Sequence, residues 1–480
     1  MFDIASLPGY LPALILPILS AWASVHILET KEDVRAALGW IAVVWLVPVA
    51  GLVGYYILGI NRVRRQAATQ RREALGGESP ADRSAGGPPL EAVDPDAPPR
   101  FCSHSRLAAH MTHMELSPAN RIDALINGDE AYPAMIAAID GAQRSVALSS
   151  YIYDWDRWGR SFADALMRAV GRGVAVRVLV DAVGGAFIAG RLRRRGVPAR
   201  AFNPLSPLNL SIFNLRTHRK LLVVDGRHGF TGGMNISDRH CAGGRAPLQA
   251  QDIMFALDGP AARQLVEVFA EDWRFAGGEK LEGAAWYPDM PDWAHAKGPA
   301  VTRAVPDSPA HTWSTAAWIL ESALSVARQH VRITTPYFLP DVTLAGALSQ
   351  AALRGVEVDI LIPERNNHRV VGWATQALLP PLLRHGCRVW LTPPPLDHAK
   401  LAVVDDYWTL LGSSNWDARS FRLNFELNLE VYDHAFAARA AALLDQRRQA
   451  ARPMSRAMLD DRPTSARLRD RACWLMSPYL

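Results

Sequence analysis

Two long apolar stretches open the chain, and short apolar runs that alternate with amphipathic segments follow them. No Asp, Glu, Lys or Arg occurs from Ile4 to Leu28 or from Ala36 to Asn61. Each stretch exceeds the ~20 apolar residues that span a bilayer. The second stretch also carries Trp and Tyr near its ends, where membrane interfaces favour them. This pattern predicts an N-terminal transmembrane helical hairpin over residues 1–65.

Basic residues flank the two stretches unevenly. The connector ETKEDVR holds two of them, whereas five arginines follow the second stretch: Arg62, Arg64, Arg65, Arg71 and Arg72. Because membrane proteins keep Lys and Arg on the cytoplasmic side, we expect the rest of the chain in the cytoplasm. The first stretch has no basic residue before it, which argues against a cleaved signal peptide.

The chain beyond the hairpin divides into a polar segment and two like halves. Residues 66–100 are rich in Ala, Gly, Pro and charged residues, a composition that predicts a flexible tether. Each half alternates short strands with helical stretches, so we predict an α/β fold with two lobes, residues 101–285 and 286–480. The halves are related by duplication, because three blocks recur at an offset of 180 to 185 residues: 143–154 with 329–341, 171–181 with 353–363, and 217–235 with 397–415.

Two lobes of like fold place equivalent strand ends on either side of a pseudo-two-fold seam. Clefts between lobes are common ligand sites, so we expect the reactive side chains that recur in both halves to meet there. The first repeated block ends in an aromatic pair in each half, which includes Tyr151 and Tyr337. These rings line either the cleft or the core, and the sequence does not decide between the two.

The third repeated block carries the same reactive side chains in the same order in both halves. Positions i and i+2 of a strand share a face, so each His is expected to point into the same space as the Lys that follows it. A second copy of the whole pattern argues against a chance match. The pattern is HxKxxxxD followed by Gly and Asn, and its members are His218, Lys220, Asp225 and Asn235, and His398, Lys400, Asp405 and Asn415.

Paired imidazoles and paired ammonium groups suit phosphodiester chemistry. One neutral imidazole can attack phosphorus and form a phosphohistidine, while the other, protonated, donates to the leaving alkoxide. The two Lys side chains, the amides of Asn235 and Asn415 and the hydroxyl of Ser413 are suited to bind the non-bridging oxygens. We expect no metal and no cofactor, since the sequence has neither an HExxH motif nor a dense carboxylate cluster.

The duplicated motif, with its trailing GGMN and GSSN, resembles the phospholipase D superfamily. The phrases FTGGMN, TPYFLPD and GSSNWDARSFRLNFELNLEVYD, together with the paired N-terminal spans, resemble bacterial cardiolipin synthases. That resemblance implies conversion of two phosphatidylglycerol molecules into cardiolipin and glycerol through a phosphatidyl-histidine. It implies His218 as nucleophile and His398 as general acid and then base, an order that the residues alone leave open.

The resemblance also implies partners and a location. The partners are phosphatidylglycerol and anionic membrane lipid, and the location is a bacterial inner membrane, with a multi-pass anchor and cytoplasmic catalytic lobes. One departure from the superfamily pattern is Gly233, which stands where the general motif has Ser. Because this glycine removes a hydroxyl donor, the two half-sites are expected to differ in role.

Acidic residues near the motifs are expected to act on the imidazoles. Each His needs an acid that fixes its tautomer. We expect Glu426 to serve His398 and Asp252 to serve His218, each within its own half, with an ordinary salt bridge as the alternative. The two acids of the repeated motif are expected to hold strand ends rather than react: Asp225 and Asp405.

Composition and charge narrow the remaining alternatives. The 52 Lys and Arg against 47 Asp and Glu give a net charge of +5, which is too small to argue for a nucleic-acid substrate. The four cysteines form no CxxC pair, so neither structural zinc nor a disulfide framework is expected. A hydrolytic phospholipase D that releases phosphatidate remains the alternative function, because the sequence does not show whether water reaches the intermediate. The two intact motifs argue against a binding-only protein, and the oligomeric state stays open.

Overall fold

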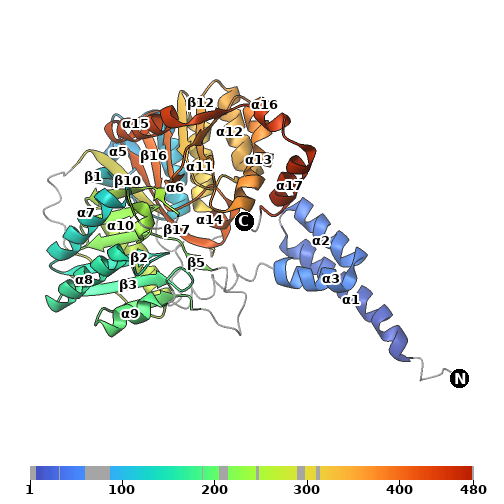
Figure 1. Ribbon diagram of the computed structural model, residues 1–480, viewed down its shortest axis with the longest axis horizontal. Coiled ribbons are helices and arrows are strands. Elements are labelled where there is room, and N and C mark those ends of the chain that lie inside the picture. Colours follow the sequence, from blue (N-terminus) through green and yellow to red (C-terminus); the bar gives the residue numbers. More distant parts are fainter. Residues whose placement is uncertain are drawn as a thin grey trace. The chain divides into compact units, whose positions relative to one another are not determined.

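The structure is a computed structural model in which two parts of the chain are separate units (Figure 1). Contacts within the chain divide it into residues 1–65 and residues 66–480, and each unit is described by itself. The structure describes residues 7–59 and 87–477, with gaps at residues 32, 186, 205–214, 245–247, 289–297 and 310–313.

The first unit is built from helices that pack on one another. The side chain of Asp33 caps the second helix by accepting from the backbone N–H groups of Arg35 and Ala36. The Ser20 hydroxyl donates to the carbonyl oxygen of Val44 at 3.1 Å and joins the first helix to the second. In the described part of the chain, no helix is at once long enough and apolar enough to cross a bilayer, so membrane passage stays a prediction. The elements are α1 (Leu7–Thr30), α2 (Val34–Leu46), α3 (Pro48–Gly54) and the π-helical turn η2 (Tyr55–Gly59).

The second unit is organised around one long sheet that runs through both lobes. In the first lobe the strand order is β4-β3-β2-β6-β7-β9-β1, and in the second it is β13-β12-β11-β15-β16-β17-β10, with β18 added beyond β13. The two orders are the same, so the predicted duplication of an α/β unit is confirmed. The strands are β1 (Ser117–Ile126), β2 (Ser145–Ser150), β3 (Ala175–Asp181), β4 (Ala199–Phe202), β6 (Leu221–Val224), β7 (His228–Gly232), β9 (Ile253–Asp258), β10 (Ala300–Asp307), β11 (His330–Thr334), β12 (Glu357–Pro363), β13 (Arg388–Thr392), β15 (Leu401–Val404), β16 (Trp408–Gly412), β17 (Asn424–Tyr432) and β18 (Arg452–Met454).

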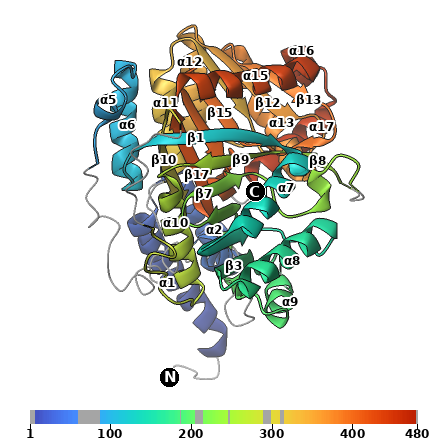
Figure 2. The same cartoon turned by 90° about the vertical axis from the view of Figure 1, so that its left-hand side faces the viewer.

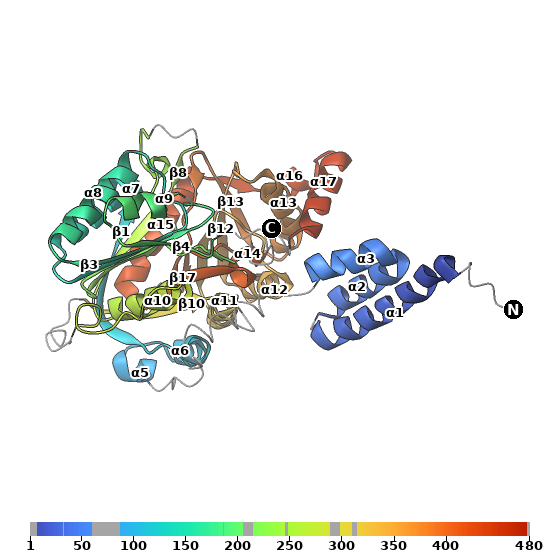
Figure 3. The same cartoon turned by 90° about the horizontal axis from the view of Figure 1, so that it is seen from below.

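The lobes join where β1 pairs antiparallel with β10, at the middle of the sheet (Figure 2). Helices cover both faces, with α7 and α8 on one side of the first lobe and α10 on the other (Figure 3). Gly173 and Gly355 end equivalent helices with φ of 83° and 91°, a conformation that glycine adopts without strain. The helices are α5 (Leu90–Val93), α6 (Pro99–Thr112), α7 (Asn127–Gly141), α8 (Arg157–Gly171), α9 (Ile188–Arg194), η5 (Asp238–His240), α10 (Ala262–Phe275), α11 (Thr315–Val326), α12 (Val342–Leu353), α13 (Arg369–Arg384), α14 (Ala418–Arg422), α15 (His434–Ala450), α16 (Arg456–Asp460) and α17 (Thr464–Leu475).

The segment that leads into the lobes packs against the second lobe. Residues 66–86 of the expected tether lie outside the described residues, whereas α5 and α6 bury Leu90 and Phe101 in the core of the second lobe. The Tyr407 hydroxyl donates to Asp94 Oδ2 at 2.5 Å, and Arg100 forms an ion pair with Asp405 at 3.2 Å. These contacts fix the end of that segment from residue 90 onward.

Two short parallel strand pairs connect the lobes at the repeated motif. β5 (Arg216–Thr217) pairs with β17 of the second lobe, and β14 (Leu396–Asp397) pairs with β8 (Ala250–Gln251) of the first. The backbone N–H of His218 continues the first pair by donating to the carbonyl of Phe425 at 2.8 Å, and that of His398 continues the second by donating to Gln251 at 2.7 Å. The backbone of each motif histidine is therefore hydrogen-bonded to a strand of the opposite lobe.

Candidate active site

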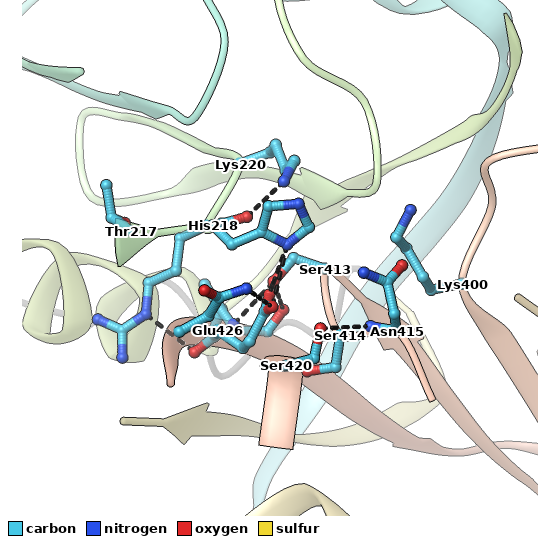
Figure 4. Close-up of polar contacts among 12 residues, drawn as sticks. Thr217, His218, Lys220, Lys400, Ser413, Ser414, Asn415, Ser420 and Glu426 are labelled. Atoms are coloured by element: carbon cyan, nitrogen blue, oxygen red, sulfur yellow. Dashed lines mark hydrogen bonds and ion pairs between the residues drawn. The ribbon is translucent and has the colours of Figure 1, made fainter. Parts of the chain in front are cut away.

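The two copies of the repeated motif meet at the seam between the lobes. Both histidines and both lysines are buried there, with each histidine 9% exposed. The cationic Lys400 of the second lobe contributes to lowering the pKa of His218, and Lys220 and His218 of the first lobe do the same for His398. These mutual effects put all four side chains in one site, as the duplication predicts, and the close-up in Figure 4 shows three of them, His218, Lys220 and Lys400.

The imidazole of His218 is held by a carboxylate with several donors. Its Nδ1 lies 3.0 Å from both Oε1 and Oε2 of Glu426 (Figure 4). The Ser413 hydroxyl donates to Oε2 at 2.5 Å, and Asn424 Nδ2 donates to Oε1 at 3.2 Å. Burial favours the neutral acid, but His218, Lys220 and Ser413 outweigh it and hold the pKa of Glu426 below its usual value. An anionic Glu426 keeps the proton of His218 on Nδ1 and leaves a lone pair on Nε2.

The imidazole of His398 is held by a shorter acid. Its Nδ1 lies 2.8 Å from Asp252 Oδ2, and the backbone N–H of Ile253 donates to Asp252 Oδ1 at 2.8 Å. Burial raises the pKa of Asp252, although Lys400 and a neighbouring histidine oppose the rise. Asp252 therefore holds a proton more readily than Glu426 does.

The expected pairing of acid and imidazole within each half is wrong. Glu426 of the second lobe serves His218 of the first, and Asp252 of the first lobe serves His398 of the second. The reason is the pair of short strands that cross the seam. β5 pairs with β17, which carries Glu426, and β14 pairs with β8, which Asp252 follows directly. Each histidine therefore lies beside the acid of the opposite lobe.

The two lysines are buried beside the imidazoles. Lys220 Nζ donates to the carbonyl oxygen of His218, and Lys400 Nζ to that of His398, both at 2.5 Å. Lys400 Nζ also lies 3.2 Å from His398 Nε2. Burial lowers the pKa of Lys400 to about 8 and that of Lys220 well below its usual value, although nearby carboxylates oppose both shifts. A bound anion would favour the charged form of both groups.

Burial also acts on the imidazoles. It lowers the pKa of His218 to about 4 even though Glu426 opposes the shift. It lowers the pKa of His398 well below its usual value, with Lys400 as the next cause. Both imidazoles are therefore neutral in the empty site at neutral pH, the form in which a ring nitrogen is nucleophilic or accepts a proton.

The three side chains predicted to bind phosphate differ in their hydrogen-bond partners. Asn235 Oδ1 accepts from the backbone N–H of Ile152 at 3.0 Å, which leaves its amide donors to the site. Asn415 is buried, and its Oδ1 has no hydrogen-bond partner among the described residues. The hydroxyl of Ser413 donates to Glu426 and accepts from the N–H of Leu427 at 3.0 Å. The expected phosphate contact of Ser413 is not favoured, because its one proton is already used to secure Glu426.

The acids that close the two motifs hold the backbone. Asp225 accepts from the N–H groups of Gln143, Arg144 and Ser145 at the start of β2. Asp405 does the same at the start of β11. Both acids therefore anchor the strand beside the motif and do not face the reacting groups, as expected from the sequence.

Three further side chains border the site, and of these only His240 carries no recognisable signal in the sequence. The ring of Tyr151 lies 5.2 Å from that of His218, and the ring of Tyr337 lies 6.3 Å from that of His398, so both tyrosines line the site. His240 is buried with its ring 6.0 Å from that of His398, and neither ring nitrogen has a hydrogen-bond partner within the described ranges of the chain. His240 follows the first motif by a spacing that has Ser in the second copy, so duplication does not reveal it. Within the described ranges, no group of three or more His, Cys, Asp or Glu side chains is arranged to hold a metal ion.

Comparison with known proteins agrees with this site. The family described as "Cardiolipin synthase, PLD-like domain" matches residues 135–273 and 320–448, one stretch in each lobe, and "Phospholipase_D-nuclease N-terminal" matches residues 18–59. The chain is 32% identical over 478 residues to cardiolipin synthase A of Pseudomonas syringae pv. syringae (strain B728a), which covers 96% of each chain. It is 30% identical to the major cardiolipin synthase ClsA of Bacillus subtilis (strain 168), over 95% of this chain and 96% of that one.

A solved structure shares the fold. The crystal structure of phosphatidylserine synthase from Haemophilus influenzae Rd KW20 superposes with a TM-score of 0.60 at 15% identity, covering 79% of this chain and 100% of that chain. Two duplicated lobes that bring paired His and Lys side chains into one site define an enzyme of the phospholipase D superfamily. Within that superfamily, the chain belongs to the cardiolipin synthase family.

Proposed function

We propose that the enzyme transfers a phosphatidyl group from one phosphatidylglycerol molecule to a second and releases glycerol. The observation that carries the proposal is the pair of buried imidazoles, each held at Nδ1 by a carboxylate of the opposite lobe. Each imidazole thereby offers Nε2 to the same space, which also receives the two lysines. Such a site suits a two-step displacement at one phosphorus atom.

In the first step, Nε2 of neutral His218 attacks the phosphorus of the donor lipid. The P–N bond forms as the bond between phosphorus and the glycerol oxygen breaks. His398 donates its proton to that oxygen, and glycerol leaves. Although burial keeps His398 neutral in the empty site, the phosphodiester anion favours its protonation when the lipid binds. Lys220 and Lys400, with the amides of Asn235 and Asn415, hold the non-bridging oxygens as charge develops.

In the second step, a hydroxyl of the second phosphatidylglycerol attacks the phosphatidyl-His218 intermediate. His398, now neutral, takes the proton of that hydroxyl, and the P–N bond breaks as the new P–O bond forms. Cardiolipin leaves, His218 is again neutral, and His398 again carries the proton that the next donor lipid needs. His398 thus alternates between acid and base while His218 remains the nucleophile, and the cycle brings no net change in protons.

The N-terminal unit supports a position at a bacterial inner membrane, with the lobes in the cytoplasm. Many large apolar side chains of this unit are exposed, including Trp22 at 63%, Leu28 at 68% and Leu46 at 80%. Exposed apolar surface of this extent is typical of contact with lipid. Since the substrates are lipids, such contact would keep the catalytic lobes within reach of them.

The decisive experiment separates transfer from hydrolysis. Purified full-length enzyme in mixed micelles with phosphatidylglycerol should yield cardiolipin and glycerol in equal amounts, measured by mass spectrometry of the lipids and an enzymatic glycerol assay. Release of phosphatidate in place of cardiolipin would instead support the hydrolytic phospholipase D function.

A further inference from the structure

Two arginines occupy equivalent positions beside the site, one in each lobe. Arg239 and Arg419 each stand four residues after the asparagine of the repeated motif, Asn235 or Asn415. Arg239 belongs to the short helix η5 and Arg419 to α14. The duplication has therefore kept a guanidinium at the same place in both half-sites.

The charges of both arginines act on side chains that border the paired imidazoles. Arg239 precedes His240, whose ring lies 6.0 Å from that of His398, and its charge acts on His398 and on Tyr337. Burial raises the pKa of Tyr151, and the charge of Arg419 opposes that rise. The ring of Tyr151 lies 5.2 Å from that of His218. Tyr151 in turn contributes to raising the pKa of Tyr337, which burial raises most. Two arginines and two tyrosines thus border the paired imidazoles.

Neither arginine has an anionic partner in the described part of the chain. Among the described residues, no carboxylate oxygen lies within 4.0 Å of either guanidinium, whereas Arg422, on helix α14 with Arg419, pairs with Asp341 at 3.9 Å. Both arginines are partly buried, and Nε of Arg239 is fully buried with no hydrogen-bond partner among the residues that the structure describes. Removing a guanidinium from water without a partner costs free energy. Such an arrangement is therefore typical of an anion-binding site.

The reacting phosphate already has its own cations, the buried lysines. Cardiolipin, however, carries two phosphodiesters joined only by a glycerol bridge. The second phosphate must therefore lie beside the reacting one while the new bond forms. A guanidinium presents a planar fork of donors that matches phosphate, which makes arginine well suited to bind it.

We propose that Arg239 and Arg419 form a second anion subsite, which binds the phosphodiester of the acceptor phospholipid and so selects an anionic lipid over water or a neutral alcohol. This inference rests on the proposed function and deepens it by assigning acceptor specificity. Arg239 makes the larger contribution, because it lies beside His398, the base that activates the acceptor hydroxyl.

The test compares two acceptors for the same phosphatidyl-enzyme. The variants Arg239→Gln, Arg419→Gln and the double variant are assayed as full-length enzyme in micelles of phosphatidylglycerol, with and without ethanol. A hydrogen bond to a charged group contributes about 1.5–3 kcal/mol, so each single variant should lower cardiolipin formation by roughly 10- to 100-fold. Formation of phosphatidylethanol should change by less than about threefold, because ethanol brings no phosphate to the subsite.

Matched controls make each outcome informative. Arg422→Gln, on the same helix as Arg419, should leave both products unchanged. Phosphatidylethanol formation by the variants shows that they are folded and that donor binding and the chemical steps are intact. Equal loss of both products, or unchanged cardiolipin formation, would overturn the subsite. Wild-type enzyme that makes phosphatidylethanol but no cardiolipin would instead refute the proposed function, a result seen before any variant is made.

Discussion

The carboxylate that holds His218 is secured by more side chains than the carboxylate that holds His398. Glu426 accepts from Ser413 and Asn424 in addition to His218. The strand register makes Asp252 the counterpart of Glu426, and the counterparts of Ser413 and Asn424 are Gly and Ala, which offer no side-chain donor. Burial raises the pKa of both acids. Around Glu426 the donors outweigh burial and the pKa is lowered, whereas around Asp252 burial prevails and the pKa is raised.

This difference provides a physical reason for the division of labour between the imidazoles. A firmly anionic Glu426 keeps the proton of His218 on Nδ1, so Nε2 is free to attack phosphorus. Asp252, whose pKa is raised, accepts a proton more readily and is suited to share the proton that His398 must carry between the leaving and entering alcohols. The similar halves of the site thus support different steps because their supporting acids differ.

The largest effects should come from removing the imidazoles themselves. We expect His218→Ala to abolish turnover, because no phosphatidyl-enzyme can form, and His398→Ala to lower it by about 10²–10⁴-fold, the usual contribution of a general acid or base. The two variants separate with an activated phosphodiester whose nitrophenolate leaves without a proton. His398→Ala should release a burst of nitrophenolate equal to the enzyme concentration, and His218→Ala should release none. The reverse pattern would exchange the two roles.

The next effect tests whether each acid acts across the seam. Glu426→Gln and Asp252→Asn should each lower turnover by about 10²–10³-fold, because the amide no longer fixes the tautomer of the imidazole that it contacts. A double-mutant cycle measures the coupling. Asp252→Asn should cost little further in an enzyme that already carries His398→Ala, which is expected to retain measurable cardiolipin formation, whereas Glu426→Gln should keep its full cost in that background. Coupling of Glu426 to His398 in place of His218 would contradict the observed pairing.

The pairing of each acid with the imidazole of the opposite lobe shows which parts of the site a sequence can and cannot predict. The repeat offset was enough to predict two like α/β lobes and the meeting of His218 with His398, because duplication carries equivalent strand ends to one seam. The sequence predicts the wrong imidazole for each acid because the strands that decide the pairing, β5 and β14, are each two residues long and leave no hydrophobic pattern. Their partners are chosen by packing between segments that are far apart in the chain.

Local chemistry shows the same limit. The sequence reveals a hydroxyl at Ser413 and a glycine at Gly233, but not that the hydroxyl is used by Glu426 or that the glycine faces Asp252. A Cβ at Gly233 would lie 2.6 Å from Asp252 Oδ1 and 2.9 Å from the carbonyl oxygen of His398. The glycine that departs from the superfamily pattern is therefore required by the close approach of the acid and the backbone beside it.

Exchanging these small residues gives a smaller and unequal effect. Gly233→Ser should push Asp252 away from His398 and lower turnover by roughly 10- to 100-fold, in line with a displaced supporting acid. Ser413→Ala leaves Glu426 in place and removes one of its hydrogen bonds. Because a hydrogen bond to a charged group contributes about 1.5–3 kcal/mol, we expect turnover to fall by roughly tenfold. Initial rates of cardiolipin formation measure both. A harmless Gly233→Ser would show that the tight contact at Asp252 relaxes freely.

The smallest effect concerns stability in acid and belongs to His240, which only the His398 half-site contains. Burial lowers the pKa of His240 to about 3, so the folded protein binds this proton less readily than the unfolded chain, whose His titrates near pH 6.5. Stability is therefore full above pH 6.5 and is lost as the pH falls towards 3, by about 2 kcal/mol at pH 5 from this residue. His240→Gln should lose less thermal stability between pH 7 and pH 5 than the wild type, as followed by tryptophan fluorescence. His110→Gln, an exposed position on α6, should keep the wild-type dependence. An equal acid loss in His240→Gln would mean that His240 takes up its proton as readily in the folded protein as in the unfolded chain, which would contradict the effect of its burial.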